Sequence, residues 1–70
     1  MPRYRYVVNR NAQENGDHEV HREGCSYYPA PENQVPLGDF TTCHPAVAKA
    51  KEIYRSADGC AYCSKECHSR

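Results

Sequence analysis

The residues of this sequence that are equipped for chemistry are its cysteines and the histidines near them. His21 and Cys25 form a His-x3-Cys pair, and Cys60 and Cys63 form a Cys-x2-Cys pair. Two close pairs from distant chain segments are typical of one tetrahedral zinc ion. We therefore predict a Zn²⁺ site whose ligands are His21, Cys25, Cys60 and Cys63.

The fourth ligand has alternatives in the next residues of the chain. Cys67 follows Cys63 at x3 spacing, and His68 follows Cys67 directly. If Cys67 or His68 completes the site, His21 is left as an ordinary strand histidine or as a group that supports the ligands. We favour His21 because its spacing from Cys25 suits a ligand pair.

Cys43 lies outside the predicted zinc site, at the expected start of a helix. A free cysteine is most often a small buried hydrophobic residue, and we expect this of Cys43. A helix N-terminus also lowers the pKa of a thiol, so Cys43 has a reactive alternative. It would then pair with Cys67, or bind a second ion with His44 or His68.

Length and composition favour a metal as a stabilising element. A chain of 70 residues buries only about 60% of its unfolded surface, so its core is small. The cysteine count is 5, and an odd number fits a framework of disulfides poorly. These observations favour zinc over disulfides.

The N-terminal sequence and the charge balance bear on compartment and partners. The N-terminus has no apolar run of a signal peptide, and no transmembrane segment is evident, so we expect a cytoplasmic protein. Cytosolic thiols stay reduced, which again favours metal binding. The formal net charge is zero, which argues against nucleic acid as a partner.

The expected elements form one domain over residues 1–70. Alternating side chains predict a strand at residues 4–9, and Asn15-Gly16 predicts a hairpin to a second strand at 17–21. Residues 34–37 predict a short strand at a sheet edge, because Pro36 cannot donate a hydrogen bond. Helical spacing starts at Thr42, and Asp58-Gly59 is expected to stop that helix.

The predicted fold class is therefore α+β. We expect a small zinc-stapled domain with a three-stranded antiparallel sheet, formed by the hairpin and the short edge strand. One helix and a C-terminal cysteine-rich turn complete it.

The pattern of these residues resembles a family of short uncharacterised bacterial proteins. The similarity spans nearly the whole chain, and it is carried by His21-x3-Cys25, Leu37-Gly38-Asp39-Phe40, Cys43, Ala46-Val47 and Gly59-Cys60-x-Tyr62-Cys63-x3-Cys67-His68. The resemblance implies a bacterial cytosolic protein and carries no activity with it.

The predicted site alone is similar to the zinc domain of the bacterial alkylation-damage response methyltransferase. That domain binds metal through a Cys-x3-Cys pair and a later Cys-x2-Cys pair, and His21 stands where it has its first cysteine. In that family the first cysteine accepts the methyl group, which an imidazole cannot do. The resemblance therefore extends to the arrangement of the zinc ligands and not to methyl transfer.

These observations lead to one main functional hypothesis and one alternative. A complete ligand set without a catalytic constellation predicts a non-enzymatic protein with structural zinc, whose surface contacts a protein partner. Tyr27 and Tyr28 are the expected exposed patch. The alternative is thiol redox sensing or metal handling through Cys43 and Cys67.

Overall fold

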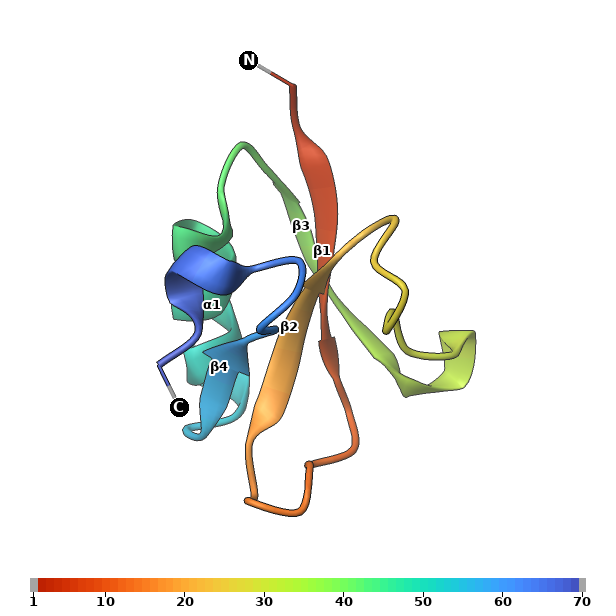
Figure 1. Cartoon of the computed structure of the whole chain (residues 1–70), viewed down its shortest axis with the longest axis vertical. Coiled ribbons are helices and arrows are strands. Elements are labelled where there is room, and N and C mark those ends of the chain that lie inside the picture. Colours follow the sequence, from red (N-terminus) through yellow and green to blue (C-terminus); the bar gives the residue numbers. More distant parts are fainter. Residues whose placement is uncertain (1, 70) are drawn as a thin grey trace.

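The computed structural model describes residues 2–69 and contains a small sheet with one α-helix against it (Figure 1). The strands are β1 (Tyr4–Asn9), β2 (His18–Arg22), β3 (Gln34–Phe40) and β4 (Ala57–Gly59). The α-helix is α1 (Cys43–Ile53), and two short 3₁₀ helices are η1 (Pro31–Asn33) and η2 (Lys65–Cys67). The α+β class predicted from the sequence is confirmed.

The sheet is mixed and has four strands in the described residues, in the order β3-β1-β2-β4. β1 pairs antiparallel with β2 and β3, whereas β4 pairs parallel with β2. The prediction of a three-stranded antiparallel sheet is therefore wrong in strand number and direction. It missed β4 because three residues are too few to show alternation, and Asp58-Gly59 resembles a helix stop. The helix instead ends at Ile53, with Tyr54 as its C-cap.

The β1–β2 hairpin agrees with the expected reversal at Asn15-Gly16. Gly16 has a φ of +89°, a conformation that a residue without a side chain adopts without steric cost. Register pairs Val8 with Val20 and Val7 with His21. Because side chains alternate along a strand, these two pairs lie on opposite faces of the sheet.

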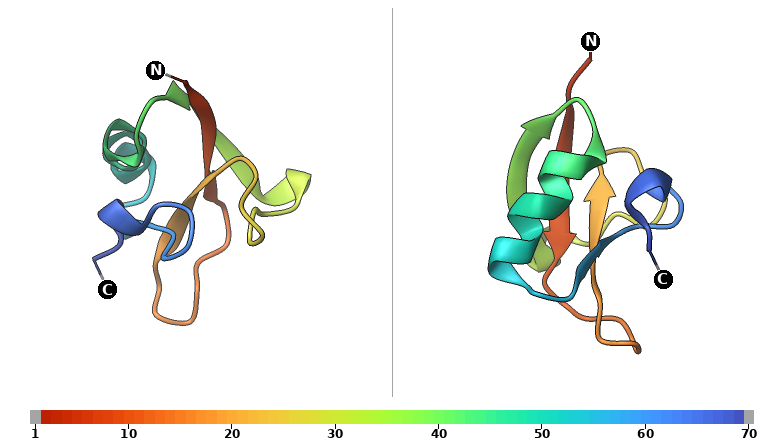
Figure 2. Two further views of the ribbon diagram at one scale, coloured as in Figure 1. Left: turned by 45° about the horizontal axis from the view of Figure 1, so that its top comes forward. Right: turned by 90° about the vertical axis from the view of Figure 1, so that its left-hand side faces the viewer.

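The face that carries Val8 and Val20 is covered by α1 (Figure 2). The buried cluster between them consists of Tyr6, Val8, Val20, Leu37, Cys43, Ala46, Val47, Ala50 and Ala57. Val8 and Val20 are fully buried, and such burial contributes about 1.5–3 kcal/mol for each side chain. Small alanines on the buried face of α1 allow the helix to approach the sheet closely.

The edge strand β3 extends further than expected. Pro36 lies in this edge strand, as predicted, but the strand continues past Gly38 to Phe40. Gly38 has a φ of +119°, and the register with β1 shifts between Tyr6 and Val7. Positive φ at Gly38 thus bends the strand without ending it.

The opposite face of the sheet carries Val7 and His21, which are 1% and 2% exposed. The chain after β4 continues beside β2, where the Cys60 N–H donates to the Val20 carbonyl at 3.0 Å. On this side of the sheet the buried His21 lies close to the cysteines of the C-terminal turn.

Candidate metal centre

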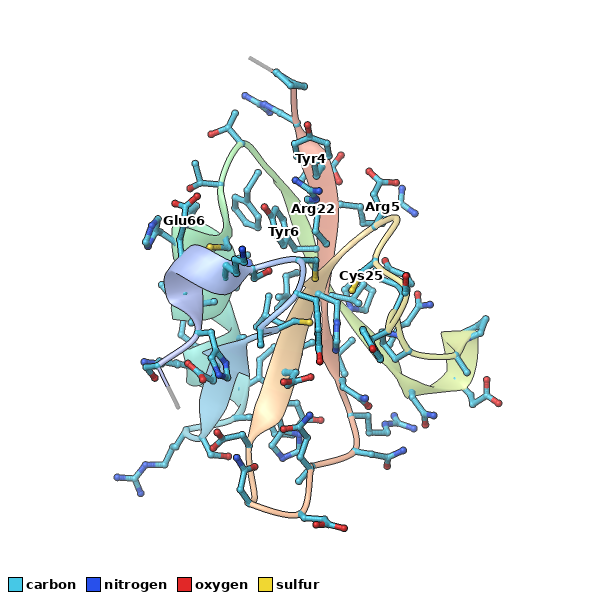
Figure 3. All side chains as sticks on the ribbon, in the orientation of Figure 1. Tyr4, Arg5, Tyr6, Arg22, Cys25 and Glu66 are labelled. Atoms are coloured by element: carbon cyan, nitrogen blue, oxygen red, sulfur yellow. A yellow bond between two sulfur atoms is a disulfide. The ribbon has the colours of Figure 1, made fainter. Side chains whose placement is uncertain are left out.

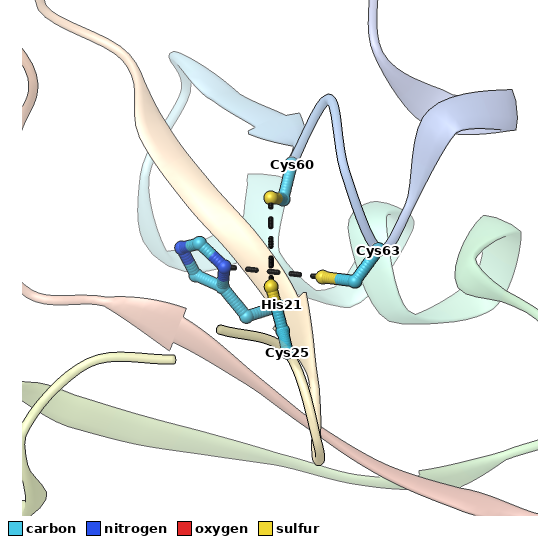
Figure 4. Close-up of side chains that lie close together, drawn as sticks. All are labelled: His21, Cys25, Cys60 and Cys63. Atoms are coloured by element: carbon cyan, nitrogen blue, oxygen red, sulfur yellow. Dashed lines mark hydrogen bonds between the residues drawn. The ribbon is translucent and has the colours of Figure 1, made fainter. Parts of the chain in front are cut away.

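Four of the predicted ligands come together on the face of the sheet opposite α1. One donor atom from each of His21, Cys25, Cys60 and Cys63 lies within 4.8 Å of the other three. We call this group the His-Cys₃ cluster, and it could hold a metal ion. Figure 4 shows the four side chains converging from β2, the turn after it and the turn after β4.

The spacing of the donor atoms is close to that of a tetrahedral zinc site. Cys25 Sγ and Cys60 Sγ are 4.0 Å apart, and Cys63 Sγ lies 3.9 Å from His21 Nδ1. Ideal zinc bonds place two sulfurs about 3.8 Å apart, and a sulfur and a nitrogen about 3.6 Å apart. The two contacts cross in Figure 4, as opposite edges of a tetrahedron do. These two separations are slightly longer than the ideal ones, and the remaining donor pairs lie within 4.8 Å of one another.

Local backbone geometry brings the first pair of ligands together. His21 is in β2, and the chain turns immediately afterwards, where the Cys25 N–H donates to the Arg22 carbonyl at 3.1 Å. Gly24 has a φ of +92° within this turn, which a larger residue adopts only with strain. The turn thereby returns Cys25 to the same side as His21.

The second pair of ligands lies in a helical turn after β4. The Ser64 N–H donates to the Cys60 carbonyl at 2.9 Å, and this turn brings Cys63 back beside Cys60. Gly59, directly before Cys60, has a packing role. A Cβ on Gly59 would lie 2.7 Å from the Cys67 Cβ and 2.7 Å from the Ser64 carbonyl oxygen. Gly59 therefore lets η2 pack directly against β4.

Each sulfur of the cluster accepts a backbone hydrogen bond. Cys63 Sγ accepts from the Arg22 N–H at 3.2 Å. Cys25 Sγ and Cys60 Sγ accept from the amides two residues further on, those of Tyr27 and Tyr62, each at 3.4 Å. A neutral thiol is a weak acceptor. Three amides aimed at three sulfurs thus suit metal-bound thiolates, whose charge they would stabilise.

His21 presents one nitrogen to the sulfurs and the other to a carboxylate. Its Nδ1 faces Cys63 Sγ, and its Nε2 lies 3.6 Å from Glu19 Oε1. A carboxylate on the far nitrogen of a ligating histidine favours the tautomer that leaves the near nitrogen free to bind. Glu19 was not predicted to have this role. Its position two residues before His21 on a strand could have indicated it, because side chains two apart on a strand lie on the same face.

Burial sets the protonation states of the metal-free cluster. Desolvation raises the pKa of Cys63 to about 12 and raises the pKa of Cys60 above its usual value. Burial also lowers the pKa of His21, which keeps its imidazole neutral at pH 7. The neutral imidazole is the form that binds metal, whereas the buried thiols need a cation to lose their protons.

Cys43 and Cys67 lie in a second group with different chemistry. Cys43, the first residue of α1, is buried, as expected. It is not a free thiol, because its sulfur is bonded to Cys67 in a disulfide, the pairing named in the alternative for Cys43. His44 Nδ1 is 3.6 Å from Cys67 Sγ, and donor atoms of Cys43, His44 and Cys67 all lie within 4.8 Å of one another. We call these three residues the helix-end cluster.

Neither alternative fourth ligand is part of the His-Cys₃ cluster. Cys67 belongs to the disulfide, and the His68 ring is directed at Gly59 and Asp58. His68 Nδ1 is 3.0 Å from the Gly59 carbonyl oxygen and 3.4 Å from Asp58 Oδ2.

Comparisons with models of protein families, with curated proteins and with solved structures found nothing that matches this chain. None of the helices within residues 2–69 has the length and apolarity needed to cross a membrane. The two clusters are therefore the features of the chain that bear on its function.

Proposed function

We propose that this protein binds one structural zinc ion through the His-Cys₃ cluster and that the folded surface beside the ion contacts a protein partner. The observation that carries the proposal is the convergence of four donor atoms within 4.8 Å. Three thiolates and one imidazole form a ligand set that zinc prefers over harder cations.

A structural role fits better than a catalytic one. Catalytic zinc keeps a position open for water, whereas this cluster supplies four protein ligands. His21 and Cys60 are 2% and 1% exposed, so substrate has little access to the ion from their side. The zinc would join β2 to the turn after β4, which are also linked by the hydrogen bond from the Cys60 N–H to the Val20 carbonyl.

The size of the effect is testable because the rest of the domain is small. Structural zinc contributes about 10–16 kcal/mol of apparent binding free energy, comparable with the whole stability of a domain, about 5–15 kcal/mol. Removing zinc with a chelator is therefore expected to abolish the cooperative melting transition. Unchanged circular dichroism and an unchanged melting temperature after complete zinc removal would contradict the structural role.

Variants separate the two clusters in this test. Cys63→Ser is expected to lose the zinc, because it removes one ligand of the His-Cys₃ cluster. The double variant Cys43→Ser/Cys67→Ser is the matched control, since it also removes thiols and leaves that cluster complete. It should still bind one zinc per chain, as measured by elemental analysis.

Two stacked tyrosines support the part of the proposal that concerns a partner. Tyr27 and Tyr62 are 56% and 70% exposed, and their ring centroids are 4.5 Å apart. Their backbone amides donate to Cys25 Sγ and Cys60 Sγ. Ordering the two metal turns would thus also order the aromatic pair, and exposed tyrosines are frequent in protein interfaces. Tyr28, the other residue of the expected patch, is only partly exposed.

Tyr27→Ser/Tyr62→Ser tests this surface. The variant should retain zinc and melt cooperatively, because both side chains are exposed. Cross-linking in cells is expected to capture a partner with the original protein and to lose it with the variant. Equal capture by both proteins would show that the tyrosine pair is not the contact surface.

The disulfide supports a second candidate function, reversible thiol chemistry at Cys43 and Cys67. Cys67 is partly exposed, and we expect a reductant to approach the disulfide from its side. Reduction should make Cys67 react with iodoacetamide while the zinc-bound cysteines stay protected. If reduced Cys67 reacts no faster than they do, this function fails.

A further inference from the structure

The helix-end cluster contains more than a disulfide. Cys43 is the first residue of α1, His44 is the second, and Cys67 ends η2. His44 Nδ1 lies 3.6 Å from Cys67 Sγ, which equals the separation of about 3.6 Å expected for a nitrogen and a sulfur on one zinc ion. The His44 nitrogen thus already lies at the distance from the Cys67 sulfur that two ligands of one zinc ion would have.

The surroundings of His44 repeat the arrangement found at His21. His44 Nε2 is 3.6 Å from Glu66 Oε2, just as His21 Nε2 is 3.6 Å from Glu19 Oε1. In both cases Nδ1 faces a cysteine sulfur and Nε2 faces a carboxylate. A carboxylate placed on the far nitrogen of an imidazole is the usual support of a metal ligand. Two occurrences in so short a chain point to the same chemistry at both places.

The helix-end cluster is also accessible. The side chain of His44 is 63% exposed, and that of Glu66 is 78% exposed. Figure 3 labels Glu66 at η2. A surface hollow of about 170 Å³ is lined by Cys43, Thr42 and Glu66 among other residues. Cys43 is itself buried, whereas Cys67 is partly exposed, so we expect a reductant and a metal ion to approach the disulfide from the side of Cys67 and His44.

We propose that reduction of the Cys43–Cys67 disulfide creates a second zinc site, with Cys43, His44 and Cys67 as ligands and Glu66 as the group that orients His44. This inference rests on the reversible thiol chemistry proposed above and is independent of the zinc in the His-Cys₃ cluster. Disulfide and metal site exclude one another, because each uses both sulfurs. The oxidation state of the pair then decides whether the chain holds one zinc ion or two.

The reaction balances with a dithiol as reductant. The dithiol gives two electrons and two protons to the disulfide, which becomes two thiols, and the reductant leaves as its own disulfide. Zn²⁺ then displaces the two thiol protons and binds both thiolates. Their sulfurs separate from bonding distance to about 3.8 Å. The helix N-terminus at Cys43 stabilises the thiolate form.

Two thiolates and one imidazole fit zinc with water in the fourth position. A site with an open position and an exposed histidine is expected to exchange zinc faster than the His-Cys₃ cluster. Its chemistry suits a protein that takes up zinc when reduced and releases it when oxidised.

Native mass spectrometry of the full chain, equilibrated with excess Zn²⁺, counts the ions directly. The oxidised protein should hold one zinc ion. After reduction by a dithiol, and removal of the dithiol without oxygen, it should hold two. The His44→Ala variant should hold one zinc ion in both the oxidised and the reduced state. Because the His44 side chain is exposed, this substitution should not unfold the protein. His68→Asn is the matched control, because His68 is adjacent to Cys67 but faces Gly59 and Asp58; it should behave as the original chain.

Glu66→Gln tests the orienting role separately from ligation. It should still bind two ions when reduced, with the second bound about 10–100-fold more weakly. A reduced chain that holds no more zinc than the oxidised chain would overturn the second site and leave the first unaffected. Two ions bound by reduced His44→Ala would also overturn it. Absence of zinc from the oxidised chain would instead contradict the His-Cys₃ proposal. In that case, the gain of one zinc ion on reduction would still support the site at the helix-end cluster, and no gain would overturn it.

Discussion

Gly59→Ala tests whether close contact between β4 and η2 holds the C-terminal turn in place. The added Cβ would lie 2.7 Å from both the Cys67 Cβ and the Ser64 carbonyl oxygen, and 2.9 Å from the Cys67 carbonyl carbon. Real Cβ atoms do not approach so closely, so β4 or η2 has to move. Two of the three contacts are with backbone atoms, which cannot rotate away.

The expected cost follows from these contacts. Overpacking a well-filled region costs about 1–3 kcal/mol, and we expect the upper part of that range because η2 is tethered by the disulfide on one side and by Cys63 on the other. Replacing glycine stiffens the unfolded chain and returns about 0.4–1 kcal/mol. Gly59 does not have positive φ, so alanine adds no backbone strain. The net loss should be about 2 kcal/mol.

Urea denaturation of the zinc-loaded protein measures this loss. A double-mutant cycle supplies the control, because Cys43→Ala/Cys67→Ala keeps both Cβ atoms but frees η2 to move away. Gly59→Ala should then cost at least about 0.5 kcal/mol less in the freed background than in the tethered one. A variant as stable as the original chain, or a cost that is equal in both backgrounds, would refute the reasoning.

Two further predictions concern the His-Cys₃ cluster. Glu19→Gln should weaken zinc binding about 10-fold while the fold persists, because the carboxylate no longer orients His21; competition with a chelator of known affinity measures this, and unchanged affinity would contradict the role of Glu19. Zinc binding at pH 7 should release at least two protons, measured by calorimetry in buffers of different ionisation enthalpy. The raised pKa values of Cys60 and Cys63 mean that both thiols are protonated before binding, and His21, with its lowered pKa, has no proton to release. Affinity should therefore rise with pH, by about 100-fold per unit for two protons, and release of fewer than two protons would contradict these protonation states.

The sequence contained most of the fold because its main elements show clear periods. Alternation predicted β1, the Asn15-Gly16 reversal predicted the hairpin to β2, and helical spacing predicted α1. β4 could not be predicted in the same way, because a strand of three residues has no period to detect. It forms because Asp58 and Gly59 are buried against β2 and η2, and these are contacts between distant segments.

The spacing of cysteines and histidines in the sequence predicted the residues of the His-Cys₃ cluster. Spacing alone could not decide whether His21 or Cys67 is the fourth ligand. The difference arises from the fold, which turns His21 toward Cys63 and directs Cys67 toward Cys43 under α1. The sequence also could not predict that Glu66 lies beside His44. The two residues are 22 positions apart in the chain and come together only when η2 packs against α1.

X-ray absorption spectroscopy of the zinc-loaded, oxidised protein tests the central claim most directly, because it counts sulfur and nitrogen ligands at the ion. We predict three sulfurs at about 2.3 Å and one nitrogen at about 2.0 Å, with loss of the nitrogen signal in His21→Cys. Four sulfurs in the original chain, or zinc held mainly by oxygen and nitrogen, would contradict the His-Cys₃ site.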